Sequence, residues 1–211
     1  MDPGLLRLRS AFTMTSSFAL LLWLVKLVEY FGGLDFTPCG IFPRQLSGLI
    51  GVFCAPFIHG SFAHLFANTA PLVVIGTMLL YGYPRAARIL LPTVYLGGGL
   101  AVWLFAREAY HVGASGLAFG MLYFVLAIGV LRWDRRAIAL ALVVFFLYGG
   151  MIWGILPDSQ DISFESHLSS ALIGTLLAFL LRRRDPEPPR KKYSWEDEDP
   201  EDDDPDWPER M

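Results

Sequence analysis

Six long apolar runs constrain this chain more than any other feature of its sequence. They cover residues 12–30, 62–81, 89–105, 112–131, 137–156 and 164–181. Each has roughly the 17 to 20 residues that a helix needs to cross a bilayer, and the runs are continuous rather than alternating, which excludes the strands of a membrane barrel. With 54% hydrophobic residues and a mean hydropathy of +0.45, the chain is too apolar for a soluble domain. We predict an all-α membrane protein with six spans.

Basic residues predict how these spans are oriented. Most of the arginines near the ends of the runs fall on one side of the predicted bundle: Arg7, Arg9, Arg85, Arg88, Arg132, Arg135, Arg136, Arg182, Arg183 and Arg184. The opposite loops contain only Arg44 and Arg107. The positive-inside rule therefore places both termini in the cytoplasm. The first run is of full length, so we expect no cleavable signal peptide.

Polar residues recur at one depth of the predicted bundle. The second, fourth and sixth runs all cross from outside to inside, so residues early in each lie near the outer face. His64 and Asn68 open the second run, Ser115 opens the fourth, and His167 opens the sixth. Polar groups at membrane depth are costly and mark functional sites. These four side chains are therefore expected to converge.

Their chemistry matches acyl transfer. A serine is a weak nucleophile unless a base takes its proton, and a neutral histidine such as His167 can do so near physiological pH. Backbone N–H groups at the start of the fourth span, that of Ser115 included, with His64 and Asn68, supply donors for an oxyanion. Glu165 lies two residues from His167 and faces elsewhere. We predict a Ser-His dyad without a carboxylate.

Structural roles compete with this interpretation for each residue taken alone. The small residues around Ser115 are also typical of close helix packing, with the serine bonded to a backbone carbonyl. His64 and Asn68 lie on one helix face and can bond the preceding loop, and His167 can be an interfacial residue. A zinc hydrolase would use His59, His64, His111 and His167, but the chain has no His-Glu-x-x-His pattern and no intramembrane carboxylate partner. We expect no metal and no cofactor.

Three segments resemble the rhomboid intramembrane serine proteases. They are Gly113-Ala114-Ser115-Gly116 followed by Phe119-Gly120, the stretch 59–68, and His167 with Gly174; parts of the loop at 40–44, 48–49 and 56–57 agree as well. The resemblance implies a six-helix rhomboid-like bundle, Ser115 as nucleophile, His167 as base, and an oxyanion site formed by His64, Asn68 and the Ser115 amide. Supporting positions would be Gly113, Gly116, Phe119, Gly120, Ser170 and Gly174.

The chain departs from the family pattern at two of these positions. Phe119 stands where relatives often have a tyrosine packed on the catalytic histidine, and Ser170 where they often have glycine. Both substitutions keep a ring or a small side chain, so the dyad is still expected. By the same resemblance, the fifth span and the loop 157–165 would form a lateral gate and cap.

The resemblance implies an integral protein of a prokaryotic cell membrane, with its site facing the extracytoplasmic side. Its substrates would be single-pass membrane proteins whose helices unwind near the outer leaflet, because a helical scissile carbonyl is engaged in the backbone ladder. The alternative is a non-catalytic rhomboid-like protein that binds membrane clients. Besides substrates and the lipid bilayer we expect no nucleic-acid partner, and the sequence leaves the oligomeric state open.

The last part of the chain differs in character. Residues 185–211 hold twelve acidic and four basic side chains and several prolines. Such a segment cannot bury enough apolar surface to fold. We predict a membrane domain over 1–184, with a long external loop at about 32–60, and a disordered acidic cytoplasmic tail over 185–211. Cys39 and Cys54 both fall in the external loop, and the sequence does not decide whether they pair.

Overall fold

The computed structural model describes residues 2–157 and 162–186. Six helices in this part are long and apolar enough to cross a membrane. The long helices are α1 (Pro3–Gly32), α3 (Phe62–Gly82), α4 (Pro84–Phe105), α5 (Ser115–Arg132), α6 (Arg135–Tyr148) and α7 (Phe164–Leu181). No strand forms within these residues, so the predicted all-α, six-span membrane bundle is confirmed.

Two spans differ in detail from the apolar runs. The first begins at Pro3, where the Asp2 side chain accepts a hydrogen bond from the Gly4 amide, so Arg7 and Arg9 lie inside the helix. The fifth changes character after Tyr148, and α6 continues as the 3-10 helix η4 (Gly149–Ile155). Hydropathy alone could not show either difference, because it measures apolarity and not hydrogen-bond pattern.

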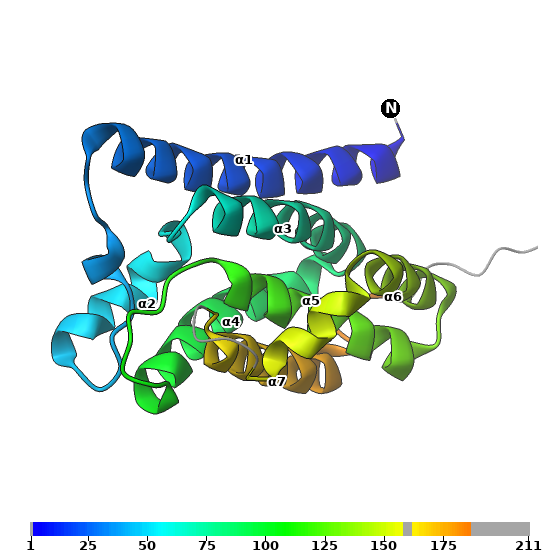
Figure 1. Ribbon diagram of the computed structural model, residues 1–211. Helices are drawn as coiled ribbons and strands as arrows, with labels where there is room; N and C mark the ends of the chain where they lie inside the picture. Colours follow the sequence, from blue (N-terminus) through cyan, green and yellow to red (C-terminus); the bar gives the residue numbers. More distant parts are fainter. Residues whose placement is uncertain (1, 158–161, 187–211) are drawn as a thin grey trace, which may run out of the picture.

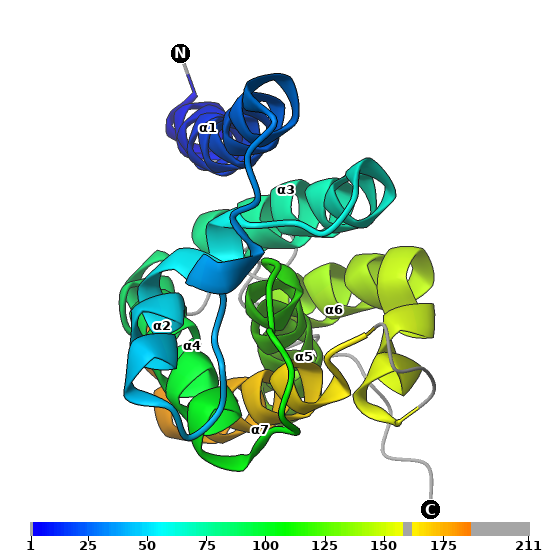
Figure 2. The same ribbon diagram turned by 60° about the vertical axis from the view of Figure 1, so that its left-hand side comes forward.

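Helix α5 is the centre of the bundle (Figures 1 and 2). It contacts α3, α4, α6 and α7, whereas α1 packs mainly against α3. Its closest neighbour is α7, because both helices have glycine where they cross: a Cβ atom at Gly174 would lie 2.2 Å from the carbonyl oxygen of Gly120. Small residues let membrane helices approach in this way. The approach brings the first turns of α5 and α7 together.

The loop between α1 and α3 folds into short helices: η1 (Thr37–Cys39), η2 (Leu46–Ile50), α2 (Gly51–Cys54) and η3 (Ala55–Phe57). Cys39 and Cys54 are both free. Backbone bonds tie this loop to the segment before α5. Ile41 and His111 exchange two of them, at 3.0 and 2.9 Å, and the Gly113 amide donates to the Ala55 carbonyl at 2.8 Å. The loop therefore fixes the position of the residues that lead into Ser115.

At the opposite end of the bundle, Asp185 bonds to the start of α4. Its carboxylate accepts hydrogen bonds from the backbone amides of Arg85 and Ala86, both at 2.9 Å, at the start of α4. The side chain is buried. Asp185 and Pro186, which we assigned to the tail, are among the described residues, and residues 187–211 of the predicted tail lie outside them.

Candidate active site

Ser115 and His167 meet between the first turns of α5 and α7. The serine Oγ lies 2.8 Å from the histidine Nε2. Ser115 is the first residue of α5 and lies two residues after Gly113, whose φ of +110° is strained for any residue with a side chain. His167 lies in the first turn of α7, and the Ser163 side chain caps that helix by accepting from the Ser166 amide. Two helix starts thus hold one hydrogen-bonded pair.

The other ring nitrogen of His167 identifies the tautomer. Nδ1 lies 2.9 Å from the carbonyl oxygen of Gly154 in η4. A carbonyl oxygen only accepts, so we assign the proton to Nδ1, which leaves Nε2 with a lone pair directed at Ser115. Glu165, as expected, lies elsewhere: it pairs with Arg107 at 3.3 Å. A backbone carbonyl therefore occupies the position that a carboxylate takes in a triad.

The ring of Phe119 stacks on the imidazole of His167. The ring centroids are 3.9 Å apart and the planes differ by 5°. Phe119 lies one helical turn after Ser115, and Gly154 leaves room for its ring, since a Cβ atom at Gly154 would lie 2.7 Å from the Phe119 Cζ. Stacking and the Gly154 bond together restrict the imidazole to one orientation.

His64 and Asn68 lie beside the serine, on the first turns of α3. A Cβ atom at Gly113 would lie 2.7 Å from the His64 Cε1 and 3.7 Å from the Asn68 Nδ2, so both side chains face the backbone just before Ser115. Asn68 is buried, and its Nδ2 has no hydrogen-bond partner within the described residues. The Ser115 amide is in the first turn of α5, where N–H groups lack a partner in the helix. The His64 ring, the Asn68 Nδ2 and the Ser115 amide thus lie around the backbone at the start of α5.

The remaining predicted supporting residues serve the packing of α5 on its neighbours. A Cβ atom at Gly116 would lie 2.5 Å from the Oγ of Ser166 and 3.0 Å from that of Ser170. Gly120 and Gly174 form the crossing of α5 and α7 described above. The serine at position 170 therefore still permits close approach of the two helices.

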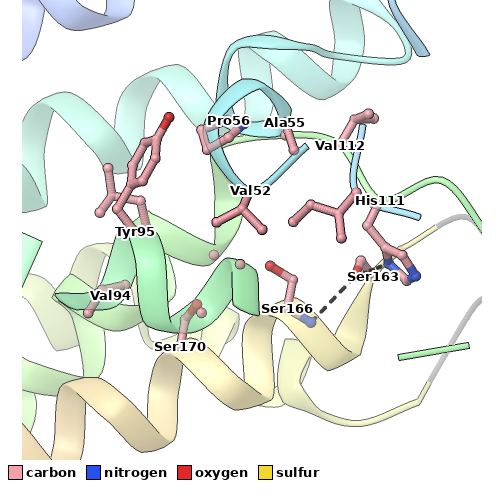
Figure 3. Close-up of a pocket in the computed structure, with 16 residues that line it drawn as sticks. Val52, Ala55, Pro56, Val94, Tyr95, His111, Val112, Ser163, Ser166 and Ser170 are labelled. Carbon is pink, nitrogen blue, oxygen red and sulfur yellow. Dashed lines mark hydrogen bonds between the residues drawn. The ribbon is translucent and has the colours of Figure 1, made fainter. Parts of the chain in front are cut away.

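A small cavity with a mixed lining lies beside Gly116, and Figure 3 shows three serines of α7 and its cap along one side of it. Its volume is about 40 Å³, which is room for a few water molecules. Ser163, Ser166 and Ser170 line it together with His111, whose Nδ1 lies 2.6 Å from the Ser163 Oγ. His111 thus belongs to the wall of this cavity.

His59 contributes to the site in a way that its position in the sequence did not indicate. It is 1% exposed, its ring lies 5.2 Å from that of His64, and its Nε2 accepts a hydrogen bond of 3.4 Å from the Ala114 amide. Burial lowers the pKa of His59 to about 4, so the ring is neutral near pH 7 and able to accept. Its bond to Ala114 supports the backbone just before Ser115.

The histidines do not form a metal site. Across residues 2–157 and 162–186, no group of three His, Cys, Asp or Glu side chains is placed to hold an ion. His59, His111 and His167 each bond to a backbone group or a serine instead. The sequence did not predict the contact of Gly154 with His167, because it depends on a carbonyl in the last turn of η4, where carbonyl groups lack a partner in the helix.

The fold and the site define a class of protein: a helical membrane bundle in which two spans hold a serine and a histidine in contact. The chain belongs to the rhomboid family: the family model described as Rhomboid domain matches residues 46–184. An uncharacterized protein of Mycobacterium tuberculosis is 38% identical over 178 aligned positions, covering 78% of this chain and 72% of the relative. An uncharacterized protein of Mycobacterium leprae is 33% identical, covering 78% and 69%. RHOMBOID-like protein 2 of Arabidopsis thaliana is 31% identical over 145 positions, which cover 66% of this chain and 43% of the plant protein.

Proposed function

We propose that this protein is an intramembrane serine endopeptidase that hydrolyses peptide bonds of single-pass membrane proteins. The observation that supports this most directly is the 2.8 Å contact between the Ser115 Oγ and the His167 Nε2. Family membership supports the same class of reaction. Ser115 and His167 act as the dyad.

Acylation begins when the Ser115 Oγ attacks the scissile carbonyl carbon while its proton moves to the His167 Nε2. The C–N bond then breaks, and the imidazolium returns that proton to the leaving amine. The Gly154 carbonyl, 2.9 Å from Nδ1, keeps the ring in the required tautomer and stabilises its charged form. The Phe119 ring, stacked on the imidazolium, adds a cation–π contact.

The tetrahedral intermediate carries a negative oxygen that needs fixed donors. The Ser115 amide, the Asn68 Nδ2 and the His64 ring supply them. The Asn68 Nδ2 is buried without a partner within the described residues, so its donor is available to the intermediate. Removing one such donor from an enzyme typically costs about 2.7 to 4 kcal/mol of transition-state stabilisation.

Deacylation requires water inside a membrane bundle. The small cavity is lined by Gly113 and Gly116, which flank Ser115 in the sequence, and by three serines, and we assign it the role of holding water for this step. A water molecule attacks the acyl carbon, gives its proton to the His167 Nε2, and releases the carboxylate product when that proton returns to the Ser115 Oγ. No cofactor takes part in this sequence.

The experiment compares purified wild-type protein with Ser115→Ala and His167→Ala on a model transmembrane substrate in detergent and in liposomes. Both variants are expected to lose activity by roughly 10⁴-fold or more. Ser169→Ala is the matched control, because Ser169 bonds the backbone of its own helix at 3.2 Å. Binding of the substrate without cleavage by the wild type would show a non-catalytic client-binding protein instead.

A further inference from the structure

A second cavity lies at the end of the bundle opposite Ser115, where α5 and α7 end. Its volume is about 550 Å³, within the usual range for small-molecule sites. The right-hand side of Figure 1 shows this end of the bundle. The lining residues are Leu131, Arg132, Arg182, Arg183, Asp185 and Pro186. Nothing in the proposed peptide hydrolysis uses this cavity.

The cavity is positively charged. Three arginines line it with one aspartate, and the carboxylate of Asp185 already accepts from the backbone amides at the start of α4. Arg182 and Arg183 are exposed. The lining therefore favours an anion.

Arg132 provides a second, independent indication. Its side chain is 5% exposed. Its Nε pairs with Asp134 at 2.7 Å and its Nη1 donates to the Asp185 backbone carbonyl at 2.9 Å. The guanidinium also lies 5.9 Å from the centre of the Tyr83 ring, but its Nη2 is buried with no hydrogen-bond partner in the part of the chain that the structure describes. A buried guanidinium donor without a partner is costly. An anion in the cavity beside it would remove that cost.

The surroundings of the cavity indicate what kind of anion this is. Val130 and Trp133, at the end of α5, are 68% and 77% exposed, and Phe179 and Leu180, at the end of α7, are 52% and 68% exposed. A guanidinium fork matches the geometry of a phosphate group, and apolar side chains suit acyl chains. Basic pockets between the ends of membrane helices bind anionic lipid headgroups.

We propose that this cavity binds the phosphate of an anionic phospholipid from the leaflet at the arginine end of the bundle. Arg132, Arg182 and Arg183 contact the phosphate, and the acyl chains lie along the exposed apolar ends of α5 and α7. The lipid thereby joins the two helices whose opposite ends carry Ser115 and His167.

Native mass spectrometry of the detergent-purified full chain tests this site. Dioleoyl phosphatidylglycerol is expected to bind the wild type at least 10-fold more tightly than dioleoyl phosphatidylcholine. The double substitution Arg182→Gln and Arg183→Gln should weaken phosphatidylglycerol binding by about 30-fold, which is about 2 kcal/mol. The matched control, Arg7→Gln with Arg88→Gln, makes the same change in charge on exposed residues of α1 and α4 outside the cavity, and should bind like the wild type.

Three outcomes would overturn the proposal. Equal weakening in the cavity variant and the control would mean that net charge, and not this cavity, attracts the lipid. Displacement of phosphatidylglycerol by millimolar inorganic phosphate would indicate a site for free phosphate. A preference for phosphatidylglycerol that emerges only after the acidic residues 201–204 are neutralised would show that the chain's own acidic segment occupies the cavity. If the double variant fails to fold, Arg132→Lys, which keeps the charge but loses the fork, takes its place with the same expected direction.

Discussion

The crossing of α5 and α7 allows the geometry of the site to be tested away from the reacting groups. In Gly174→Ala the new Cβ atom would lie 2.2 Å from the Gly120 carbonyl oxygen, whereas such contacts are not found below 3.0 Å, so the helices must separate by about 0.8 Å. If that displacement reaches the first turns, the Ser115–His167 contact lengthens from 2.8 Å to about 3.6 Å, beyond hydrogen-bond length.

The expected result is a loss of about 100-fold in the rate of cleavage, since a displacement of about 1 Å has this effect in other enzymes. Overpacking should also lower the free energy of unfolding by about 1 to 3 kcal/mol. Cleavage of a model transmembrane substrate and labelling of Ser115 by a fluorophosphonate measure the first effect, and thermal unfolding measures the second.

Gly97→Ala is the matched control for this substitution. It adds the same methyl group to α4, where the nearest atom is the flexible end of the Ile173 side chain at 3.3 Å. The rates of substrate cleavage and of Ser115 labelling should therefore stay near those of the wild type. Wild-type cleavage and labelling in folded Gly174→Ala would refute the argument that this crossing sets the distance between Ser115 and His167.

Two further predictions concern stability. Asp185→Asn replaces one of two acceptor oxygens with a donor, so one amide at the start of α4 loses its partner. The free energy of unfolding, measured in a titration with sodium dodecyl sulfate, should fall by about 2 kcal/mol. An unchanged midpoint would contradict this role of Asp185. For His59, burial lowers the pKa from 6.5 to about 4, so between these values the unfolded chain binds a proton that the folded one does not. The free energy of unfolding should therefore fall by about 3 kcal/mol as the pH decreases from 6.5 to 4 and stay constant above that window. Thermal unfolding across this range should show a smaller slope for His59→Gln, and the same slope in both proteins would exclude His59 as the source.

The spans were predictable because apolar length is a property of each segment alone. Their alternating direction also predicted that His64, Ser115 and His167 lie at one depth, and the structure brings them together. These inferences needed no knowledge of how the helices pack. They used only the thickness of the membrane and the order of the runs.

Other features depend on contacts between distant segments, and the sequence did not reveal them. The Gly154 carbonyl is free to accept from His167 because Gly154 lies in the last turn of η4, where carbonyl groups have no partner in the helix. His59 supports Ala114 only because the loop after α1 folds back on the segment before α5. In the sequence Asp185 is the first residue of an acidic segment, and only the structure shows that it bonds to the start of α4.

The bond between Gly154 and His167 joins the base to the span that ends in η4, and only 6% of the residues in the apolar stretch of this span are buried in the bundle. A substrate helix that enters by displacing this span would take away the carbonyl that sets which nitrogen carries the proton. On the proposed mechanism His167 acts as the base while this carbonyl holds its Nδ1 proton, so such a displacement would have to be reversed before Ser115 is activated. Substrate entry and peptide hydrolysis would then be separate steps, and a protein in which this span stayed displaced would not cleave its substrate.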